Sequence, residues 1–495
     1  MHSIVEYYSG HEGYKCGYCK SPNTNYSHGM WAHSMTVSDY QDLIDRGWRR
    51  SGKYCYKPTM EVTCCPMYTI RCRVQEFKAS KSQKKVLKRY NKIMLGQTES
   101  QSGGDASRKM STGSSELNVE EGRDQFVEPN RAPQIVDLLN VVNDCPPDKD
   151  STEKTDEKAA GDPPAPVASQ NETQTAAKPA KLNETKKGAG PDPNKAPCKK
   201  AKQLRRERKL EKLLEKGVDV TSLNTNKNLE KQVEDFINEL PQDVAKRLQI
   251  KLVRTAPPSP EYLATAKQTH EVYVKYQTVI HDSKPEKCEE SGFTDFLVKS
   301  PLVEEHSETG PACGYGSFHQ QYWLDGKLIG IGVIDILPKC VSSVYFFYDP
   351  EYMNLTLGTY AALREIAFTR QLSAQCPLLQ YYYMGYYIHS CPKMRYKGNF
   401  HPSDLLCPET YNWFPITQCI PKLEESPYSR LDPDIDNVDN NMPNDKDINY
   451  IPVLYKSSII QFKVYRKKFP VVDELLEYAR LVGNKTAKNM ILYRG

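Results

Sequence analysis

One long segment limits what this chain of 495 residues can fold into. Residues 96–198 are polar, rich in Pro, Ala and Lys, and nearly free of aromatic side chains. Such a segment cannot bury enough apolar surface to offset the entropy lost on ordering, so we expect it to be disordered. The prediction is two globular parts, residues 1–95 and 246–495, separated by this linker and by a basic helical segment over residues 199–245.

The N-terminal part is dense in Cys, Tyr, Trp and Gly. Alternation of β-branched and aromatic residues predicts strands within 52–60 and 67–77, and helical spacing of apolar residues predicts a helix within 39–52. Residues 77–95 follow, with basic side chains on one side and apolar ones on the other. We therefore expect a small Cys-rich domain over residues 1–95.

The C-terminal part has the pattern of an α+β domain. Ser259-Pro260 opens a helical pattern, and Asp325-Gly326 joins two apolar runs as a hairpin turn does. The remaining elements we expect are strands over 247–255, 340–350 and 378–388, and a long helix over 357–373. Helices and antiparallel strands in series predict the α+β class.

The cysteines indicate a reducing compartment. The N-terminus shows no signal peptide pattern, and the chain has no apolar run of 18 residues, so we expect neither secretion nor a membrane span. In such a setting, clustered members of the 15 cysteines indicate metal ligands or reactive thiols before disulfides. Tracts of Lys and Arg are compatible with both cytoplasmic and nuclear residence, which is our expectation.

Two cysteine pairs suggest a metal site. Cys16 and Cys19 form a C-x-x-C pair, and Cys64-Cys65 supplies two more thiolates, enough for a zinc ion or an iron–sulfur cluster. Adjacent ligands fit one small ion poorly, which favours the cluster. The alternative is that Cys64 and Cys65 are buried and unreactive. Other residues that could replace one of these ligands are Cys55, Cys72, His28 and His33.

Long, unusual motifs carry a family resemblance. "CGYCK" (16–20), "TCCPMYTIRCR" (63–73), "GYGSFHQQYWLDGKLIGIGVIDILP" (314–338) and "YYYMGYYIHSCPKMRYKG" (381–398) closely resemble the eukaryotic arginyl-tRNA–protein transferases. The resemblance covers about residues 1–95 and 245–425, and it does not extend to the linker.

The resemblance implies an enzyme that moves arginine from arginyl-tRNA to the N-terminal α-amine of proteins beginning with Asp, Glu or oxidised Cys. The product is an N-degron for ubiquitin-dependent degradation. It also implies an acetyltransferase-like (GNAT-like) C-terminal domain that uses no coenzyme A, and an iron–sulfur cluster or zinc at Cys16, Cys19, Cys64 and Cys65.

Asp335 is the catalytic candidate. It lies at the end of the strand "GVIDILP", where GNAT-like folds open their cleft, and the resemblance assigns it such a role. A carboxylate there could take the amine proton and pair with the arginyl guanidinium. The alternative is a carboxylate that caps a turn.

The acidic acceptor needs a basic pocket. Lys393, Arg395 and Lys397 follow the buried strand over 378–388, beside His389. An Arg fork suits a carboxylate or sulfonate, although a basic surface loop has the same composition. Further candidates for substrate binding, with core packing or core hydrogen bonding as the alternative, are His319, Gln320 and Tyr387.

Two basic tracts and one helix start are candidates for tRNA contacts, although the basic helix over 199–216 could equally present a solvated face. Basic side chains bind phosphates with little sequence readout, and a helix N-terminus binds phosphate. The residues are Lys84, Lys85, Lys88, Arg205, Arg206, Gly358 and Arg364.

Two other functions fit parts of the pattern. One is a metal-stabilised tRNA- or RNA-binding adaptor with an inactive GNAT-like domain. The other is an N-acetyltransferase using coenzyme A, but only a lone Leu357-Gly358 stands where that function needs a Gly-rich loop. We therefore expect a transferase whose partners are arginyl-tRNA and proteins with acidic N-termini, and a monomer or weak oligomer.

Overall fold

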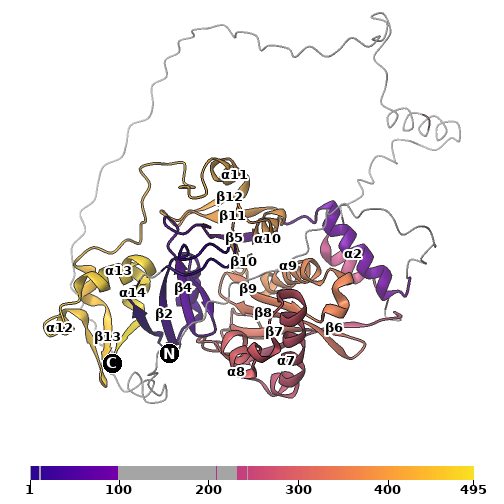
Figure 1. The fold of residues 1–495 in the computed structure, drawn as a ribbon, viewed down its shortest axis with the longest axis horizontal. Coiled ribbons are helices and arrows are strands. Elements are labelled where there is room, and N and C mark those ends of the chain that lie inside the picture. The colour runs from indigo at the N-terminus through magenta and orange to yellow at the C-terminus, as the bar shows by residue number, and fades with distance from the viewer. Residues whose placement is uncertain (1, 11–12, 98–207, 209–230, 242–243) are drawn as a thin grey trace, which may run out of the picture. The chain divides into compact units, whose positions relative to one another are not determined.

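The computed structural model describes residues 2–10, 13–97, 208, 231–241 and 244–495 (Figure 1). All of these except Arg208 belong to one compact unit. The predicted linker beyond residue 97 and most of the predicted basic segment over 199–245, with Arg205 and Arg206, lie outside the described residues.

An eight-stranded mixed sheet forms the larger part of the unit, in the order β12-β11-β5-β10-β9-β8-β7-β6. The strands in that order are β12 (Trp413–Pro415), β11 (Ser403–Leu406), β5 (Tyr68–Arg73), β10 (Tyr381–Tyr387), β9 (Cys340–Tyr348), β8 (Lys327–Ile336), β7 (Gly316–Leu324) and β6 (Leu248–Ala256). β7 and β8 form the predicted hairpin. Its turn residues Asp325 and Gly326 have φ of 50° and 81°, the left-handed conformation that this turn requires.

A second sheet of seven strands joins both ends of the chain, in the order β14-β13-β15-β1-β2-β4-β3. The strands in that order are β14 (Ser458–Gln461), β13 (Pro452–Tyr455), β15 (Ile491–Arg494), β1 (Ile4–Tyr8), β2 (Ser27–Ser34), β4 (Tyr54–Pro58) and β3 (Arg49–Ser51). The C-terminal β15 lies between β13 and the N-terminal β1, parallel to both.

The sheets cross the predicted domain boundaries. β5, from the segment predicted as a Cys-rich domain, pairs with β10 and β11 of the C-terminal part. β1, from the same segment, pairs with β15. The two segments therefore share both sheets, and the observed class is α+β with two mixed sheets.

Helices pack against both sheets. They are α1 (Val37–Ile44), α2 (Lys81–Met94), α6 (Val233–Asn238), α7 (Pro260–His281), α8 (Glu290–Phe293), α9 (Leu357–Gln375), α10 (Pro392–Arg395), α11 (Ile416–Glu425), α12 (Phe462–Tyr465), α13 (Val472–Val482) and α14 (Asn484–Asn489). α7 begins where predicted, with the Ser259 side chain accepting a hydrogen bond from the Tyr262 backbone. No helix in the described ranges has both the length and the apolar character needed to cross a membrane.

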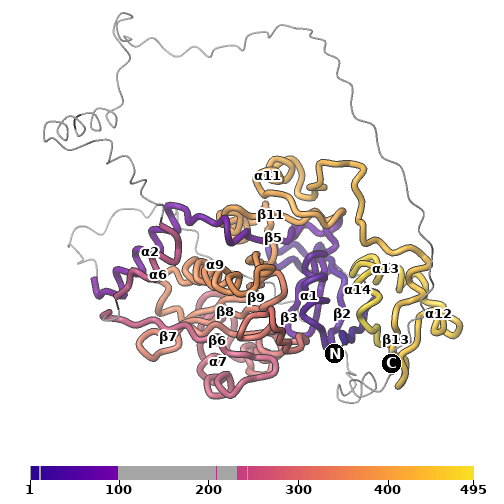
Figure 2. Tube along the Cα trace, turned by 180° about the vertical axis from the view of Figure 1, so that it is seen from behind, coloured from indigo at the N-terminus to yellow at the C-terminus, as the bar shows by residue number. Residues whose placement is uncertain are grey.

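α7 and α9 lie on opposite faces of the larger sheet, as Figures 1 and 2 show. The His319 ring of β7 contacts the Tyr262 ring of α7, and the next residue, Gln320, lines a cavity with Arg364 of α9. Consecutive strand residues point to opposite faces, which accounts for this arrangement. α2 packs against α9. Tyr90 of α2 stacks on Tyr360 of α9, with ring centroids 3.9 Å apart.

The parallel pair β9–β10 stays together over only three residues. Tyr381, Tyr382 and Tyr383 pair with Cys340, Val341 and Ser342, and no ladder follows. The ladder between β10 and β5 shifts register after Tyr383, and Gly385 has φ of 67°. The two strands therefore diverge beneath the first turns of α9, which places an opening in the middle of the sheet.

Candidate functional site

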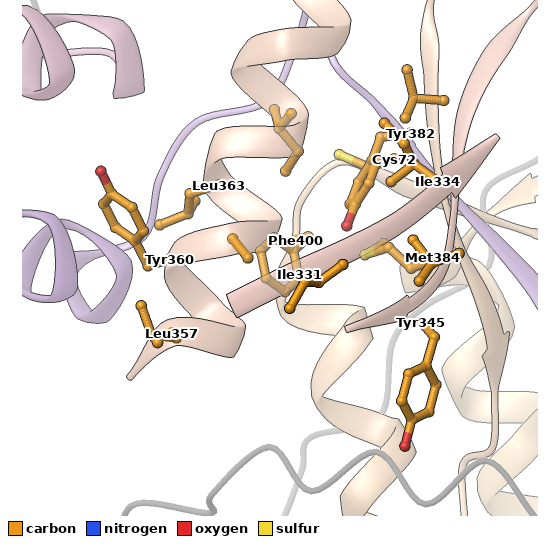
Figure 3. Close-up of a cluster of buried hydrophobic side chains, with 14 of the residues drawn as sticks. Cys72, Ile331, Ile334, Tyr345, Leu357, Tyr360, Leu363, Tyr382, Met384 and Phe400 are labelled. Atoms are coloured by element: carbon orange, nitrogen blue, oxygen red, sulfur yellow. The ribbon is translucent and has the colours of Figure 1, made fainter. Parts of the chain in front are cut away.

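A cavity of about 60 Å³ lies at the divergence of β9 and β10. Its polar lining comes from Ser343 of β9, Glu365 of α9, Tyr382 of β10 and Lys397, which follows α10. Gly358, in the first turn of α9, also lines it. Figure 3 shows aromatic and aliphatic side chains of α9, β8 and β10 packed around this region, with Tyr382 among them.

Glu365 is a buried carboxylate in this cavity. Its side chain is 1% exposed, and the Tyr382 hydroxyl donates a hydrogen bond to Oε2 at 2.6 Å. Burial raises the pKa of Glu365 to about 7. No ion pair reaches this carboxylate from any Lys, Arg or His within the described ranges. No local signal in the sequence distinguishes this residue, because a Glu inside a helical pattern looks like a solvent-facing one.

Gly332 makes room for that carboxylate. A Cβ at this position of β8 would lie 2.8 Å from Oε1 of Glu365. A glycine is needed here because the Glu365 carboxylate approaches the β8 backbone closely, and any side chain at position 332 would collide with it.

Lys397 is the other charged group of the cavity. It is 4% exposed, and its Nζ donates a hydrogen bond to the carbonyl oxygen of Tyr386 at 3.0 Å. The cavity therefore holds an acidic group from α9 and a basic group from the segment after α10. Aromatic rings form much of the remaining wall: Tyr276, Tyr345, Phe346, Tyr396 and Phe400.

Asp335, the predicted catalytic residue, lies in a buried ion pair. Arg50 of β3 donates to both carboxylate oxygens, at 2.8 Å from Nε and 2.6 Å from Nη2. The Ser317 hydroxyl donates to Oδ1 at 2.6 Å. Asp335 has no measurable exposure. Its ion pair with Arg50 joins β8 of the larger sheet to β3 of the second sheet. Its predicted role as a proton acceptor stays a prediction.

The structure separates the predicted pair His319 and Gln320. His319 faces α7, and its Nε2 lies 2.9 Å from the carbonyl oxygen of Leu297. Burial lowers the pKa of His319 to about 4, so the ring is neutral at pH 7. Gln320 faces the other side and lines a larger cavity, of about 570 Å³, together with the predicted Arg364.

The predicted acceptor residues gather after β10. The Tyr387 hydroxyl lies 2.8 Å from Nδ1 of His389, and Lys393 and Arg395 are exposed on the short helix α10. Burial, and then the charge of Arg395, lower the pKa of His389. The four residues are close in sequence and space, which is compatible with a basic pocket and with a basic surface loop.

The predicted tRNA contacts lie in different places. Lys84, Lys85 and Lys88 are on α2, where Lys85 and Lys88 are exposed. Gly358 is the second residue of α9, preceded by a short 3-10 helix, Pro350–Leu355, rather than directly by a strand. Arg364 borders the larger cavity on the same helix.

The four predicted metal ligands come together. The thiols of Cys16, Cys19, Cys64 and Cys65 lie within 4.8 Å of one another, so the group could hold a metal ion. Cys16 and Cys65 are buried, and the other two are exposed. A backbone hydrogen bond at Ser21 is the main cause that lowers the pKa of Cys19 to about 7, which favours a thiolate there.

The alternative ligands are elsewhere. Cys55 is in the core of the seven-stranded sheet, and Cys72 is in that of the eight-stranded sheet. His28 lies 3.3 Å from the Tyr7 hydroxyl through Nδ1, and His33 pairs with Glu6. The buried thiols of the metal group instead pack with three residues from β10 and beyond: Tyr386, Ile388 and Met394.

Comparisons with known proteins assign the chain to a class and a family. Two family models match: "Arginine-tRNA-protein transferase, N terminus" over residues 14–85, and "Arginine-tRNA-protein transferase, C terminus" over residues 268–407. Arginyl-tRNA–protein transferase 1 of Drosophila melanogaster is 41% identical over 508 residues, covering 99% of each chain. Arginyl-tRNA–protein transferase 2 of Arabidopsis thaliana is 36% identical, covering 84% of this chain and 76% of its own.

A partial similarity extends to bacteria. The aspartate/glutamate leucyltransferase of Pseudoalteromonas atlantica is 38% identical over 99 residues, which is 18% of this chain and 41% of its own. Together the matches place the protein among the aminoacyltransferases that act on proteins. It belongs to the arginyl-tRNA–protein transferase family, which transfers arginine from tRNA to proteins, and the family resemblance seen in the sequence is confirmed.

Proposed function

We propose that this enzyme arginylates proteins that begin with Asp, Glu or oxidised Cys, and so creates an N-degron for ubiquitin-dependent degradation. The observation that carries the proposal is the 41% identity over nearly the whole chain to a named arginyltransferase. The acidic acceptor has further support. The partly similar bacterial enzymes are named for aspartate and glutamate, and Lys393, Arg395 and His389 lie together after β10.

The reaction is aminolysis of an ester. The neutral α-amine forms a bond to the arginyl carbonyl carbon, the bond from that carbon to the ribose oxygen of tRNA breaks, and the amine proton ends on that oxygen. The ordinary pKa of an α-amine is about 8, so a useful fraction is neutral at pH 7. Positioning of the amine against the ester therefore supplies much of the rate.

We place the reaction at the divergence of β9 and β10. Two parallel strands that separate, with α9 beginning over the opening between them, support the GNAT-like architecture expected from the sequence. Gly358 stands where the backbone N–H groups of the first turn of α9 can meet a phosphate or the ester oxygen. The side chains after β10 would hold the acidic residue of the acceptor.

The four clustered cysteines are the proposed site of a zinc ion or an iron–sulfur cluster. A closed set of four thiolates is typical of a structural centre, which contributes folding free energy when it is bound. Metal analysis and the visible absorption of iron–sulfur proteins distinguish the two occupants.

The test is transfer of labelled arginine from arginyl-tRNA to two peptides that differ only in beginning with Asp or Ala. We expect labelling of the Asp peptide alone. Lys393→Ala with Arg395→Ala should weaken the reaction with the Asp peptide at least ~10-fold through a raised KM. The matched control is Lys456→Ala with Lys463→Ala, two exposed lysines beside β13 and β14. Transfer to neither peptide by folded protein would instead favour an RNA-binding adaptor.

Salt dependence tests the α2 contacts. Replacing Lys85 and Lys88 by Glu should weaken tRNA binding. It should also flatten the plot of log affinity against log salt concentration by roughly 0.7–0.9 per lost phosphate contact. An unchanged slope would remove α2 from the tRNA interface.

A further inference from the structure

We propose that Glu365 binds the guanidinium of the arginyl group and so makes the enzyme specific for arginine. The inference rests on the proposed function, since it names the group that selects the amino acid at the same cavity.

The first argument is the lack of a cation. Carboxylates buried to this degree normally have a cationic partner or several hydrogen-bond donors. The other five buried carboxylates of the described chain follow this rule. Three have cations: Asp335 with Arg50, Asp349 with Lys275 and Lys327, and Asp404 with Arg71 and Arg73. The other two, Asp39 and Asp432, have hydrogen-bond donors instead. Glu365 accepts hydrogen bonds from the Tyr382 and Ser343 hydroxyls but has no ion pair within the described ranges, and unlike the others it lines a cavity. A cation supplied by a ligand would complete it.

The second argument is the size and lining of the cavity. A water molecule needs about 10–15 Å³ of such space, so 60 Å³ holds a group of about four to six heavy atoms. A guanidinium has four. The walls include Tyr345, Phe346 and Tyr396, and guanidinium groups stack on aromatic faces.

The third argument is orientation. Lys397 repels a guanidinium and lies in the same cavity, so the charged end of the substrate has one favourable position, against the carboxylate of α9. The Asp335–Arg50 pair shows the geometry expected there, with two donors of one guanidinium at 2.6 and 2.8 Å from one carboxylate. The Asp335 carboxylate already has a guanidinium on both oxygens, whereas Glu365 has none within the described ranges.

The experiment compares one tRNA carrying either arginine or citrulline, the neutral isostere of arginine, with the Asp peptide as acceptor. The full-length wild-type enzyme should prefer the arginyl group by roughly 100-fold in kcat/KM, because citrulline leaves the carboxylate without its cation. In Glu365→Gln this preference should fall at least ~10-fold, whereas Glu365→Asp, which keeps the charge, should retain most of it.

The matched control is Asp349→Asn, which also neutralises a buried carboxylate but outside the cavity, and should leave the preference unchanged. Thermal unfolding of each variant establishes that it is folded. A folded Glu365→Gln enzyme with the wild-type preference would overturn the inference. Wild-type protein that transfers arginine to neither peptide would overturn the proposed function instead.

Discussion

At the scale of single residues, two buried carboxylates, Asp335 and Glu365, have different surroundings. Asp335 has a guanidinium on both oxygens, whereas Glu365 accepts hydrogen bonds from the Tyr382 and Ser343 hydroxyls and lines a cavity. Burial raises the pKa of Glu365 to about 7. Within the part of the chain that the structure describes, the same kind of side chain is therefore held in an ion pair at Asp335 and lines a cavity without an ion pair at Glu365.

The raised pKa of Glu365 makes stability depend on pH. A carboxyl that holds its proton more tightly when folded favours the folded state at low pH. That contribution is lost as the pH rises through about 7. Glu365→Gln does not titrate, so the variant should be more stable than wild type by up to about 3 kcal/mol at pH 8. The difference should shrink toward pH 5. Urea unfolding across this range measures it, and a difference independent of pH would contradict the assignment.

The Arg50–Asp335 pair should be strongly coupled. Asp335→Asn leaves Arg50 buried without its counter-charge, which should cost about 3–5 kcal/mol of the free energy of unfolding. Arg50→Met should cost a similar amount, and the double variant much less than the sum. A double-mutant cycle by urea denaturation gives the coupling energy. Additive effects would mean that the pair does not form.

At the scale of elements, the end of β10 connects the cysteine cluster to the predicted acceptor residues. Cys16 and Cys65 pack against Tyr386 and Ile388 of this region and Met394 of α10. Lys393 and Arg395 are on the same short helix. A helix of four residues has little stability of its own, so its position depends on what packs beneath it.

Loss of the metal should therefore loosen this element. In Cys65→Ser, or after chelation, amide hydrogen exchange over residues 386–395 should become faster by at least ~10-fold, because the packing around the thiols is lost. Residues 452–461, which form β13 and β14, serve as the internal control. If the amides of residues 386–395 exchange equally slowly with and without metal, the metal centre does not support α10.

At the scale of the whole molecule, the two ends of the chain complete one sheet. β15 hydrogen-bonds to β1 on one side and to β13 on the other. Leu492 has no measurable exposure and pairs with Val5 and Val453. Order in the N-terminal strands therefore depends on the last residues of the chain.

Leu492→Ala should lower the free energy of unfolding by about 2–5 kcal/mol, as expected for a large-to-small change in a core. Hydrogen exchange in β1 should become faster as well. Val438→Ala, at a position 66% exposed, should change stability by less than about 0.5 kcal/mol. If hydrogen exchange in this variant becomes faster only in β15 and not in β1, the N-terminal and C-terminal strands fold independently of each other.

Local signals in the sequence predicted several elements and the cysteines that come together. The Ser259 cap starts α7, Asp325-Gly326 turns the β7–β8 hairpin, and the paired cysteines assemble as predicted. Each depends on neighbours within a few residues, or on a thiol preference that is independent of fold. The motifs also indicated the family, which the comparisons confirmed.

Only the tertiary structure decided which distant segments meet. The family resemblance ended near residue 425, yet β13 and β15 complete the second sheet. Likewise "SHGMWAHS" (27–34), which contains the candidate ligands His28 and His33, is strand β2 of that sheet. Asp335 was expected in a cleft and is paired with Arg50, while Glu365 was not singled out and lines the cavity. The reason is physical. Long-range pairing and burial set the environment of a carboxylate, and periodicity along the chain does not contain that information.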